Sequence, residues 1–395
     1  MKSIDNVDFS GGIDNVSPVD ALQDKTVRDL CNFDPNPTGK LTLRPSLLQQ
    51  EVLTDVVGAV HVDNDIIVVA DTLRRFYSSK GYSVSIGAAP AGSTVIGAGL
   101  NGDAFLQVGV TQLRVRGETV APWALPEIVP QVSVVAGALP AGVYKVAVTA
   151  LDTFNAESGA TPLVVHLTQP GAISLTWVAP TGAVETRVYC SATDGETLYL
   201  QGSPTSTMVI ANLRDDTAVM TTKFLQPPPL ASQIAAYKGR LMLAAGSTLW
   251  GTAPFAPHLV NYVSGFISYG ADIQMIQPVD GGIYVATDNR TYFVEDFGLE
   301  TERQSIVAEV GATAGSQVLL PDGRGTWLTP YGQVFGDPGG KLDFPQRQRY
   351  APPIASAASA GVFNHNGVQV VVNNLRGAVN PNTLAVTDSF DMEID

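Results

Sequence analysis

The stretch Tyr237–Thr252, YKGRLMLAAGSTLWGT, holds two short apolar runs that are each introduced by a turn. Lys238-Gly239 precedes the run Leu241–Ala245, and Gly246-Ser247 precedes a half-apolar run that includes Trp250. Runs this short, bounded by turn residues, do not match the length of a helix. The stretch therefore predicts a tight β-hairpin.

The same order of turn, apolar run, turn and half-apolar run occurs six times in the chain. The first turns lie at positions 64, 102, 239, 282, 323 and 367. Four of the five gaps, 38, 43, 41 and 44 residues, are similar, and the other gap, 137 residues, is one repeat plus about 95 residues. A period of about 40–45 residues with four short strands is typical of a β-propeller blade. The alternative is an all-β chain with turns at irregular intervals.

The composition favours an all-β globular protein. The chain has 395 residues, 45% hydrophobic and 15% charged, with 38 glycines and 26 prolines to form connections. Only residues 19–33 and 230–237 are expected to hold one or two helical turns. The N-terminus lacks the apolar core of a secretory signal, and no run approaches the roughly 18–20 apolar residues of a membrane helix. We therefore expect no membrane span, synthesis in a cytoplasm, and reduced Cys31 and Cys190.

The charge balance argues against a protein that binds nucleic acid by neutralising phosphates. The chain has 23 basic and 37 acidic residues, a net charge of −14. Affinity for DNA comes largely from Lys and Arg that displace counterions. A channel that DNA passes without being held is compatible with this balance, because an acidic wall repels phosphates. We hypothesise that the excess Asp and Glu line such a channel.

The long gap between the second and third turns holds a segment of different character, in which apolar residues alternate with polar or small ones. Such alternation suits strands that are half-buried against a second sheet. Six or seven short strands in about 95 residues suggest a fibronectin type III or immunoglobulin-like β-sandwich. Trp177 is expected at the centre of its core, with Tyr144 and Tyr189 beside it.

The sandwich divides the chain into three predicted parts: a first propeller part with an N-terminal closing segment at 1–125, the inserted sandwich at 126–225, and a second propeller part at 226–395. One blade per repeat gives a ring of about six blades, which needs strands from both ends of the chain to close. KLTLRP, residues 40–45, and TLAVTD, residues 383–388, are expected to pair for this purpose.

Two regions resemble virion proteins of bacteriophages. SGGIDNVSPVDALQDKTVRDLCNFDPNPTGKLTLRPSL, residues 10–47, resembles the opening of many proteins of the short-tail nozzle or tail-tube-associated type, in which an early loop leads to a strand ending in Arg-Pro. PPPLASQIAAYKGRLMLAAGSTLWGTAPFAPHLVNYV, residues 227–263, and IQPVDGGIYVATDNRTYFVEDFG, residues 276–298, are similar to the middle of the same proteins. These motifs are architectural, and the resemblance covers about half of the chain.

The resemblance implies a structural protein of the bacteriophage tail rather than an enzyme. It implies a nozzle or hub component that assembles as a homo-oligomer, a hexameric ring below the portal or adaptor. Other tail, adaptor or fibre proteins are the implied partners, with the sandwich contacting fibres or neighbours. DNA would pass through transiently without specific binding, and the protein would be located in the virion after synthesis in the host cytoplasm.

No constellation for catalysis is evident, and we assign no catalytic, cofactor-binding or metal-binding residue and no cofactor. Neither cysteine has a nucleophile-like context, and no G-x-S-x-G elbow occurs. Gly97–Gly102 matches a G-x-G-x-x-G fingerprint, but strand-like residues follow it, which favours a glycine-rich hairpin connection. The histidines are too far apart in sequence to signal a zinc site: His61, His166, His258 and His365.

Some motifs allow both a structural and a functional interpretation. Asp322–Trp327 comes close to the Asp-box turn of sialidase propellers, but it lacks the initial serine. Asp63-Asn64-Asp65 and Asp215-Asp216 could bind Ca²⁺ or, as is more common, cap hairpins. Arg74-Arg75 and Arg114-x-Arg116 are expected to face a neighbouring subunit or an acidic surface, or else solvent at a strand edge.

Two other function classes stay open. A receptor- or glycan-binding module at a tail tip or baseplate predicts a solvent-facing aromatic cluster that involves Trp123, Tyr262 or Trp327. A propeller glycosidase predicts a funnel lined by paired carboxylates, and the sequence offers no such constellation.

Overall fold

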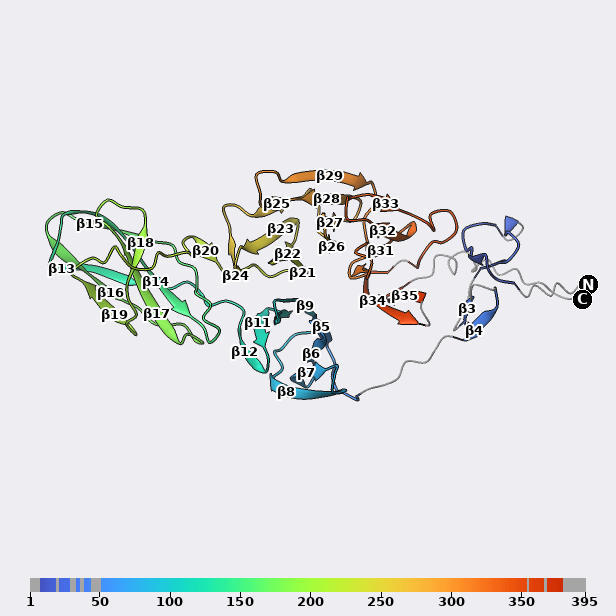
Figure 1. Ribbon diagram of the computed structural model, residues 1–395, viewed down its shortest axis with the longest axis horizontal. Helices are drawn as coiled ribbons and strands as arrows, with labels where there is room; N and C mark the ends of the chain where they lie inside the picture. The colour runs from blue at the N-terminus through green and yellow to red at the C-terminus, as the bar shows by residue number, and fades with distance from the viewer. Residues whose placement is uncertain are drawn as a thin grey trace, which may run out of the picture. The chain divides into compact units, whose positions relative to one another are not determined.

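The computed structural model (Figure 1) describes residues 8–18, 21–28, 33–35, 39–43, 51–353, 355–365 and 368–378. In these residues the regular elements are β-strands, most of them in small antiparallel sheets, and no α-helix is present. The protein is therefore all-β, as its composition predicts. None of the described segments is a helix long and apolar enough to span a membrane. The chain divides into two compact units, residues 51–268 and residues 1–50 with 269–395, which are described separately.

Residues 51–268 contain three sheets that each begin with a predicted hairpin. The first consists of β5 (Gly58–Val62), β6 (Asp65–Val69), β7 (Thr72–Tyr77) and β8 (Tyr82–Ala88). The second consists of β9 (Val95–Leu100), β10 (Asp103–Val108), β11 (Thr111–Arg116) and β12 (Thr119–Pro122). The third consists of β21 (Gln233–Tyr237), β22 (Arg240–Ala245), β23 (Thr248–Ala253) and β24 (Ala256–Asn261), with β20 (Leu225–Gln226) beside β24 and β25 (Phe266–Ser268) beside β23.

Strand β10 links these sheets because its successive side chains point to opposite faces. Leu106 lies in a core shared with the first sheet, where it packs with Leu73. Phe105 lies in another core, shared with the third sheet, which contains Trp123 and Leu241. The second sheet is thus packed on both of its faces.

The G-x-G-x-x-G motif begins within strand β9 and does not open a helix. A Cβ atom on Gly99 would lie 2.8 Å from the carbonyl oxygen of His61, and one on Gly97 would lie 3.1 Å from a methyl group of Val60. Glycine at these positions lets β9 approach β5 closely. Sheet packing therefore explains the motif.

Residues 131–210 form a β-sandwich. One sheet contains β13 (Gln131–Leu139), β16 (Gly171–Thr176) and β19 (Thr207–Ile210) in that order. The other contains β15 (Leu163–Leu167), β14 (Gly142–Leu151), β17 (Glu185–Ser191) and β18 (Leu198–Gly202). Tyr144 and Trp177 lie in the core between the sheets, as expected. Tyr189 does not, because its neighbours Val188 and Cys190 point into that core and Tyr189 points to the opposite face of β17.

The strand order of the sandwich differs from that of immunoglobulin domains. In those domains the first two strands belong to the same sheet, whereas β13 and β14 belong to different sheets. The likeness to an immunoglobulin-like domain is therefore in the two packed layers and not in the connectivity.

The other unit contains three further sheets. The fourth has β26 (Met275–Val279), β27 (Gly282–Ala286), β28 (Thr291–Glu295) and β29 (Arg303–Ala308). The fifth has β30 (Val318–Leu319), β31 (Gly325–Thr329), β32 (Gly332–Gly336) and β33 (Leu342–Asp343), and the sixth has β34 (Ala357–His365) and β35 (Val368–Arg376). The Tyr284 ring joins the fourth sheet to the fifth, with centroids 4.7 Å from Phe293 and 5.1 Å from Trp327.

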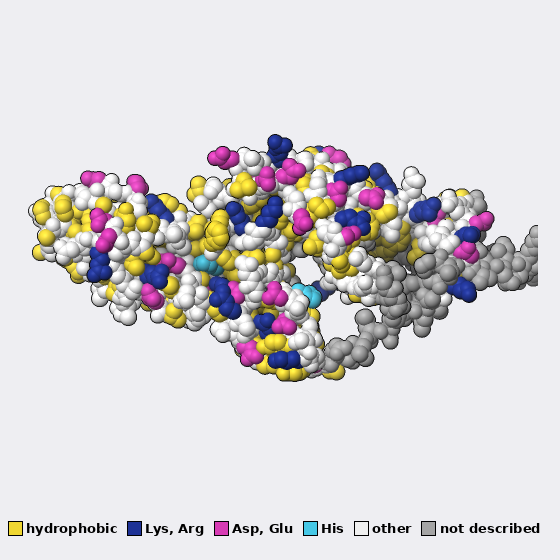
Figure 2. All heavy atoms as spheres, in the orientation of Figure 1, with side chains coloured by type: hydrophobic (Ala, Val, Ile, Leu, Met, Phe, Trp, Pro, Cys, Tyr) yellow, Lys and Arg dark blue, Asp and Glu magenta, His cyan; other side chains and the backbone are white. Residues whose placement is uncertain are grey.

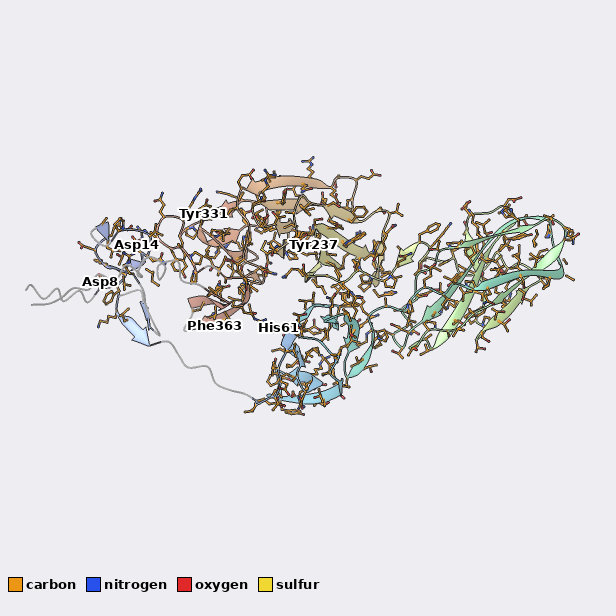
Figure 3. All side chains as sticks on the ribbon, turned by 180° about the vertical axis from the view of Figure 1, so that it is seen from behind. Asp8, Asp14, His61, Tyr237, Tyr331 and Phe363 are labelled. Carbon is orange, nitrogen blue, oxygen red and sulfur yellow. The ribbon has the colours of Figure 1, made fainter. Side chains whose placement is uncertain are left out.

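The N-terminal segment belongs to this unit. β1 (Gly12–Ile13) pairs with β2 (Thr26–Val27), and β3 (Phe33–Pro35) pairs with β4 (Leu41–Leu43). Asp8 forms an ion pair with Lys25 at 2.7 Å, and Asp14 accepts the backbone N–H of Ser17 at 2.9 Å (Figure 3). The side-chain oxygen of Asn15 accepts the backbone N–H of Ala351 at 2.9 Å. This bond ties the start of the chain to the connection between the fifth and sixth sheets.

Five of the six predicted turns each join two consecutive antiparallel strands of a separate sheet, and the sixth, Asn366-Gly367, lies outside the described residues. The expected helical turn at 230–237 is wrong, because Gln233–Tyr237 forms β21 and places Ile234 and Ala236 against the core shared with the second sheet. The expected closing pair stays a prediction, since β4 pairs with β3 and TLAVTD lies outside the described residues.

Candidate functional site

The histidine side chains that the structure describes are not gathered into a metal site. Within the described ranges, no group of three or more His, Cys, Asp and Glu side chains could hold a metal ion. His61 and His166 are exposed, and His258 is buried on β24. The side chain of His365 lies outside the description.

The one cysteine that the structure describes, Cys190, is not accessible as a nucleophile. Cys190 is fully buried in the sandwich core, and burial raises the pKa of its thiol to about 12. A thiol with so high a pKa is protonated at neutral pH and is a poor nucleophile. Cys31 lies outside the described residues.

The acidic motifs are turns in the structure. Asp322, between β30 and β31, accepts the backbone N–H of Arg324 at 3.1 Å and pairs with its guanidinium at 2.7 Å. Asp63 adopts a φ of 52° in the turn between β5 and β6. These positions support the structural interpretation of both motifs, and Asp215 and Asp216 are exposed.

The first arginine pair forms ion pairs within the first part of the chain. Arg75 lies 2.8 Å from Asp65, and its side chain is 12% exposed. Arg74 lies 3.5 Å from Glu51. Both guanidinium groups are therefore neutralised inside the chain rather than presented to solvent at a strand edge.

The second arginine pair is held by one buried carboxylate. Asp103 on β10 lies 2.5 Å from Nη2 of Arg114 and 2.6 Å from Nε of Arg116, both on β11. Burial by itself would raise the pKa of Asp103, but the hydrogen bonds from Arg116 and Arg114 and their charges outweigh it, and the pKa lies below its usual value. Arg114 is buried, so neither a subunit contact nor a solvated edge describes it.

An aromatic side chain of the sandwich covers these arginines. The Arg114 guanidinium lies 5.3 Å from the ring centroid of Phe105 in the second sheet and 4.9 Å from that of Phe154 in the sandwich. Arg116 lies 5.0 Å from the Phe154 ring. Cations near ring faces are attracted to them, more strongly where water is excluded. We call Asp103, Arg114, Arg116 and Phe154 the arginine latch, since it fixes the sandwich to the second sheet.

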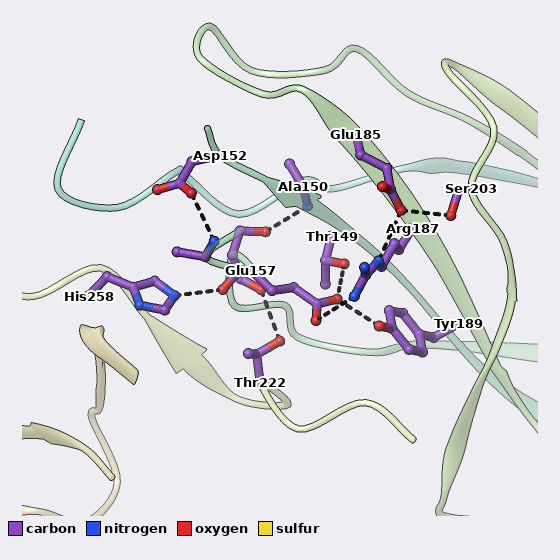
Figure 4. Close-up of polar contacts among 12 residues, drawn as sticks. Thr149, Ala150, Asp152, Glu157, Glu185, Arg187, Tyr189, Ser203, Thr222 and His258 are labelled. Atoms are coloured by element: carbon purple, nitrogen blue, oxygen red, sulfur yellow. Dashed lines mark hydrogen bonds and ion pairs between the residues drawn. The ribbon is translucent and has the colours of Figure 1, made fainter. Parts of the chain in front are cut away.

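The loop that carries Phe154 is braced by a polar network (Figure 4). The Asp152 carboxylate accepts the backbone N–H groups of Phe154 and Ala156, both at 2.8 Å. The Glu157 carboxylate accepts hydrogen bonds from Thr149 at 2.5 Å and from Tyr189 at 2.7 Å. Tyr189 thus serves the junction instead of the sandwich core.

His258 connects the third sheet to the same loop. Its Nε2 lies 2.9 Å from the backbone oxygen of Glu157. Because a carbonyl oxygen only accepts, Nε2 must carry the proton. Burial lowers the pKa of His258, which keeps the ring neutral at neutral pH. Trp123 adds a link between the second and third sheets, since its Nε1–H donates to the carbonyl of Pro257 at 3.0 Å.

An exposed aromatic cluster occurs on the third sheet. The ring centroid of Trp250 lies 4.8 Å from those of both Tyr262 and Phe266, and Tyr262 and Phe266 are each 40% exposed. We call these three residues the aromatic patch. In Figure 2 hydrophobic side chains gather where Figure 1 places β20 and β24. The aromatic cluster expected from the sequence is wrong for Trp123 and Trp327, which are fully buried.

Sequence reasoning missed both the arginine latch and the Glu157 network. Phe154 lies 40 positions after Arg114 in the sequence, and nothing local signals that its ring meets the pair formed by Arg114 and Asp103. The aromatic patch carried a readable signal, because no Asp, Glu, Lys or Arg occurs between Arg240 and Asp272.

No protein-family model and no curated protein matches the chain. Among solved structures, the extracellular domain of a one-component system from B. thetaiotaomicron has a TM-score of 0.29 at 9% identity, over 80% of this chain and 36% of that one. The extracellular domain of a hybrid two-component system from the same organism has a TM-score of 0.24 at 11% identity, over 82% and 58%. The CNH domain of AfRom2 has a TM-score of 0.19 at 8% identity, over 73% and 93%. The chain spans 36% of the first of these chains and 58% of the second. Similarities this weak define neither a shared fold nor a function.

Proposed function

We propose that the protein is a structural protein of a bacteriophage virion, a tail nozzle or hub component that forms a ring on the genome-exit path. The observation that supports this most directly is the succession of six hairpin-led sheets, interrupted once by a sandwich. In this proposal the sheets close into a propeller of about six blades. Copies of the chain then assemble into a ring, which is hexameric in the proteins that the sequence resembles.

The internal pairing of the charged groups suits a mechanical role. Asp103, Glu157 and Asp322 each bond to side chains of the same chain. A rigid β scaffold of this kind holds its neighbours at fixed positions and requires no reaction step. The proposed neighbours are other tail, adaptor and fibre proteins, in a virion assembled from protein made in the host cytoplasm.

The net charge suits a channel that DNA passes without specific binding. A chain of net charge −14 lacks the excess of cations that holds phosphates. In the proposed ring, Asp and Glu side chains face the lumen and repel the DNA backbone. Acidic side chains found mainly on the outer wall of the assembled ring would reject this part of the proposal.

The proposal is tested by locating the protein in particles of the phage whose genome encodes it. Gold-conjugated antibodies raised against the purified full chain are imaged on intact virions by electron microscopy. Label on the tail axis below the head is expected. Absence of the protein from virions would overturn the proposal, and label on peripheral appendages would favour a receptor-binding module instead.

A receptor- or glycan-binding role is the second candidate, because Tyr262 lies in the exposed aromatic patch. A propeller glycosidase has no comparable support. The turn at Asp322 that resembles an Asp box has its carboxylate paired with Arg324, as a structural turn would.

A further inference from the structure

The strands that carry the aromatic patch are uncharged. No Asp, Glu, Lys or Arg occurs between Arg240 and Asp272, whereas the whole chain has a net charge of −14. A strongly acidic protein repels anionic ligands over several ångströms, and no cation of this stretch is present to attract them. A ligand of the aromatic patch is therefore expected to be neutral.

Neutral hydrogen-bonding groups border the aromatic patch. Trp250 pairs directly with Phe266, and Thr248 pairs with Ser268 two residues away. Residues two apart on a strand share a face, so these hydroxyls lie beside the rings, with oxygens 3.5 Å apart and exposed.

The composition of the aromatic patch, three rings beside two hydroxyls, suits a small ligand. Sites for small molecules combine aromatic walls with a few placed polar groups. A pyranose sugar has the complementary surface, with apolar C–H groups on its faces and hydroxyls at its edge.

We propose that the aromatic patch binds an uncharged saccharide, a function beyond the structural role in the virion. The C–H face of a pyranose lies on Trp250 and Phe266, and its hydroxyls bond to those of Thr248 and Ser268. The patch is preorganised for this contact. The hydroxyl of Tyr262 donates to the carbonyl of Pro227 at 3.2 Å, which restrains the ring before any ligand arrives.

The test uses the purified full chain on an array of neutral oligosaccharides of hexoses and N-acetylhexosamines, with sialylated and sulfated ones alongside. The strongest neutral binder is then titrated by acrylamide quenching of tryptophan fluorescence. Trp250 is the accessible reporter, because Trp123, Trp177 and Trp327 are 5% exposed or less. Bound saccharide is expected to protect this fluorescence, and Tyr262→Ala or Phe266→Ala, which both keep Trp250, to raise the Kd roughly tenfold or more.

Phe255→Ala is the matched control. Phe255 is a fully exposed aromatic residue at the turn between β23 and β24 and is not part of the aromatic patch. This variant is expected to bind like the wild type, and circular dichroism confirms that each variant is folded.

The inference is overturned by an array on which no neutral saccharide binds or only anionic ones do. It is also overturned if the patch variants bind as tightly as the wild type. Loss of self-association in the patch variants, with no effect of saccharide, would assign the patch to a second copy of the chain. Location in the virion is measured separately, so failure of saccharide binding and failure of the structural role are distinguishable.

Discussion

The arginine latch and the aromatic patch belong to the same compact unit and are built in opposite ways. In the latch, the side chains of Arg114 and Asp103 are paired and only 7% and 4% exposed, and Arg116 pairs with the same carboxylate. In the aromatic patch, Tyr262 and Phe266 are uncharged and 40% exposed. Removing one partner of a buried ion pair is strongly destabilising, whereas truncating an exposed ring costs the fold little. The arginine latch therefore stabilises the scaffold, whereas the rings of the aromatic patch stay exposed to solvent.

The sharpest way to break this comparison is Asp103→Asn. The substitution leaves the buried guanidinium of Arg114 without a counter-charge, and we expect the free energy of unfolding to fall by about 3–5 kcal/mol. Chemical denaturation of the full chain measures it. Glu196→Gln is the control, because its ion pair with Lys145 has a 75% exposed carboxylate, and it is expected to unfold like the wild type. Equal effects of the two substitutions would contradict the role of the latch.

Phe154→Leu isolates the contribution of the ring in the latch. Leucine keeps most of the apolar volume but removes the face on which Arg114 and Arg116 lie. We expect a loss of about 1–2 kcal/mol, the range of partly desolvated cation–π contacts. If the ring face matters most, Phe154→Ala is expected to lose no more stability than Phe154→Leu. If Phe154→Leu is as stable as the wild type, the ring acts only by filling space.

His258 should make the junction sensitive to pH. Burial lowers its pKa in the folded protein, with Arg114 adding to the shift and the neighbouring Glu157 and Asp152 opposing it. Below the unfolded value of about 6.5, the unfolded chain therefore binds more protons at this ring than the folded protein. The stabilisation is complete above that pH and is lost as the pH falls toward the folded-state pKa.

The measurement is the free energy of unfolding of the wild type and His258→Gln between pH 7 and 5. The wild type is expected to lose more stability on acidification, by at most about 1.4 kcal/mol per pH unit for one group. His166→Gln, which removes an exposed histidine of the sandwich, should follow the wild type. Parallel curves for wild type and His258→Gln would exclude the ring as the cause.

The smallest effect is expected in the aromatic patch. Tyr262→Ala and Phe266→Ala change side chains that are 40% exposed, and we expect the free energy of unfolding to change by no more than about 0.5 kcal/mol. Thermal unfolding of the same samples used for saccharide binding measures it. A loss as large as that of Phe154→Leu would mean that the patch is part of the scaffold, and the contrast with the latch would fail.

Local turn chemistry explains why the repeated hairpins were predictable. Asn101 and Gly102, and Lys238 and Gly239, adopt positive φ at the turns where the sequence placed them, a conformation that Gly and Asn adopt most readily. Alternation of apolar residues likewise predicted the sandwich and the burial of Tyr144 and Trp177. These signals lie within a few residues of the structure that they specify.

The remaining features depend on contacts between distant parts of the chain. Tyr189 lies on the face of β17 opposite the predicted core, where Glu157, distant in sequence, accepts a hydrogen bond from its hydroxyl. The burial of Arg114 depends on Phe154, which the sequence gives no reason to place nearby. Trp123 and Trp327 were predicted to face solvent, but both are buried where neighbouring sheets pack together. Exposure is a property of the assembled sheets, so single-residue reasoning could not assign it.

The proposed tail function depends on the six hairpin-led sheets closing into one ring. A cryo-EM reconstruction of the protein in the assembled particle tests it most directly. We expect the sheets to surround one axis in sequence order and the sandwich to project from the ring between the second and third sheets. Sheets packed without a common axis, or a particle whose tail axis lacks this protein, would contradict it.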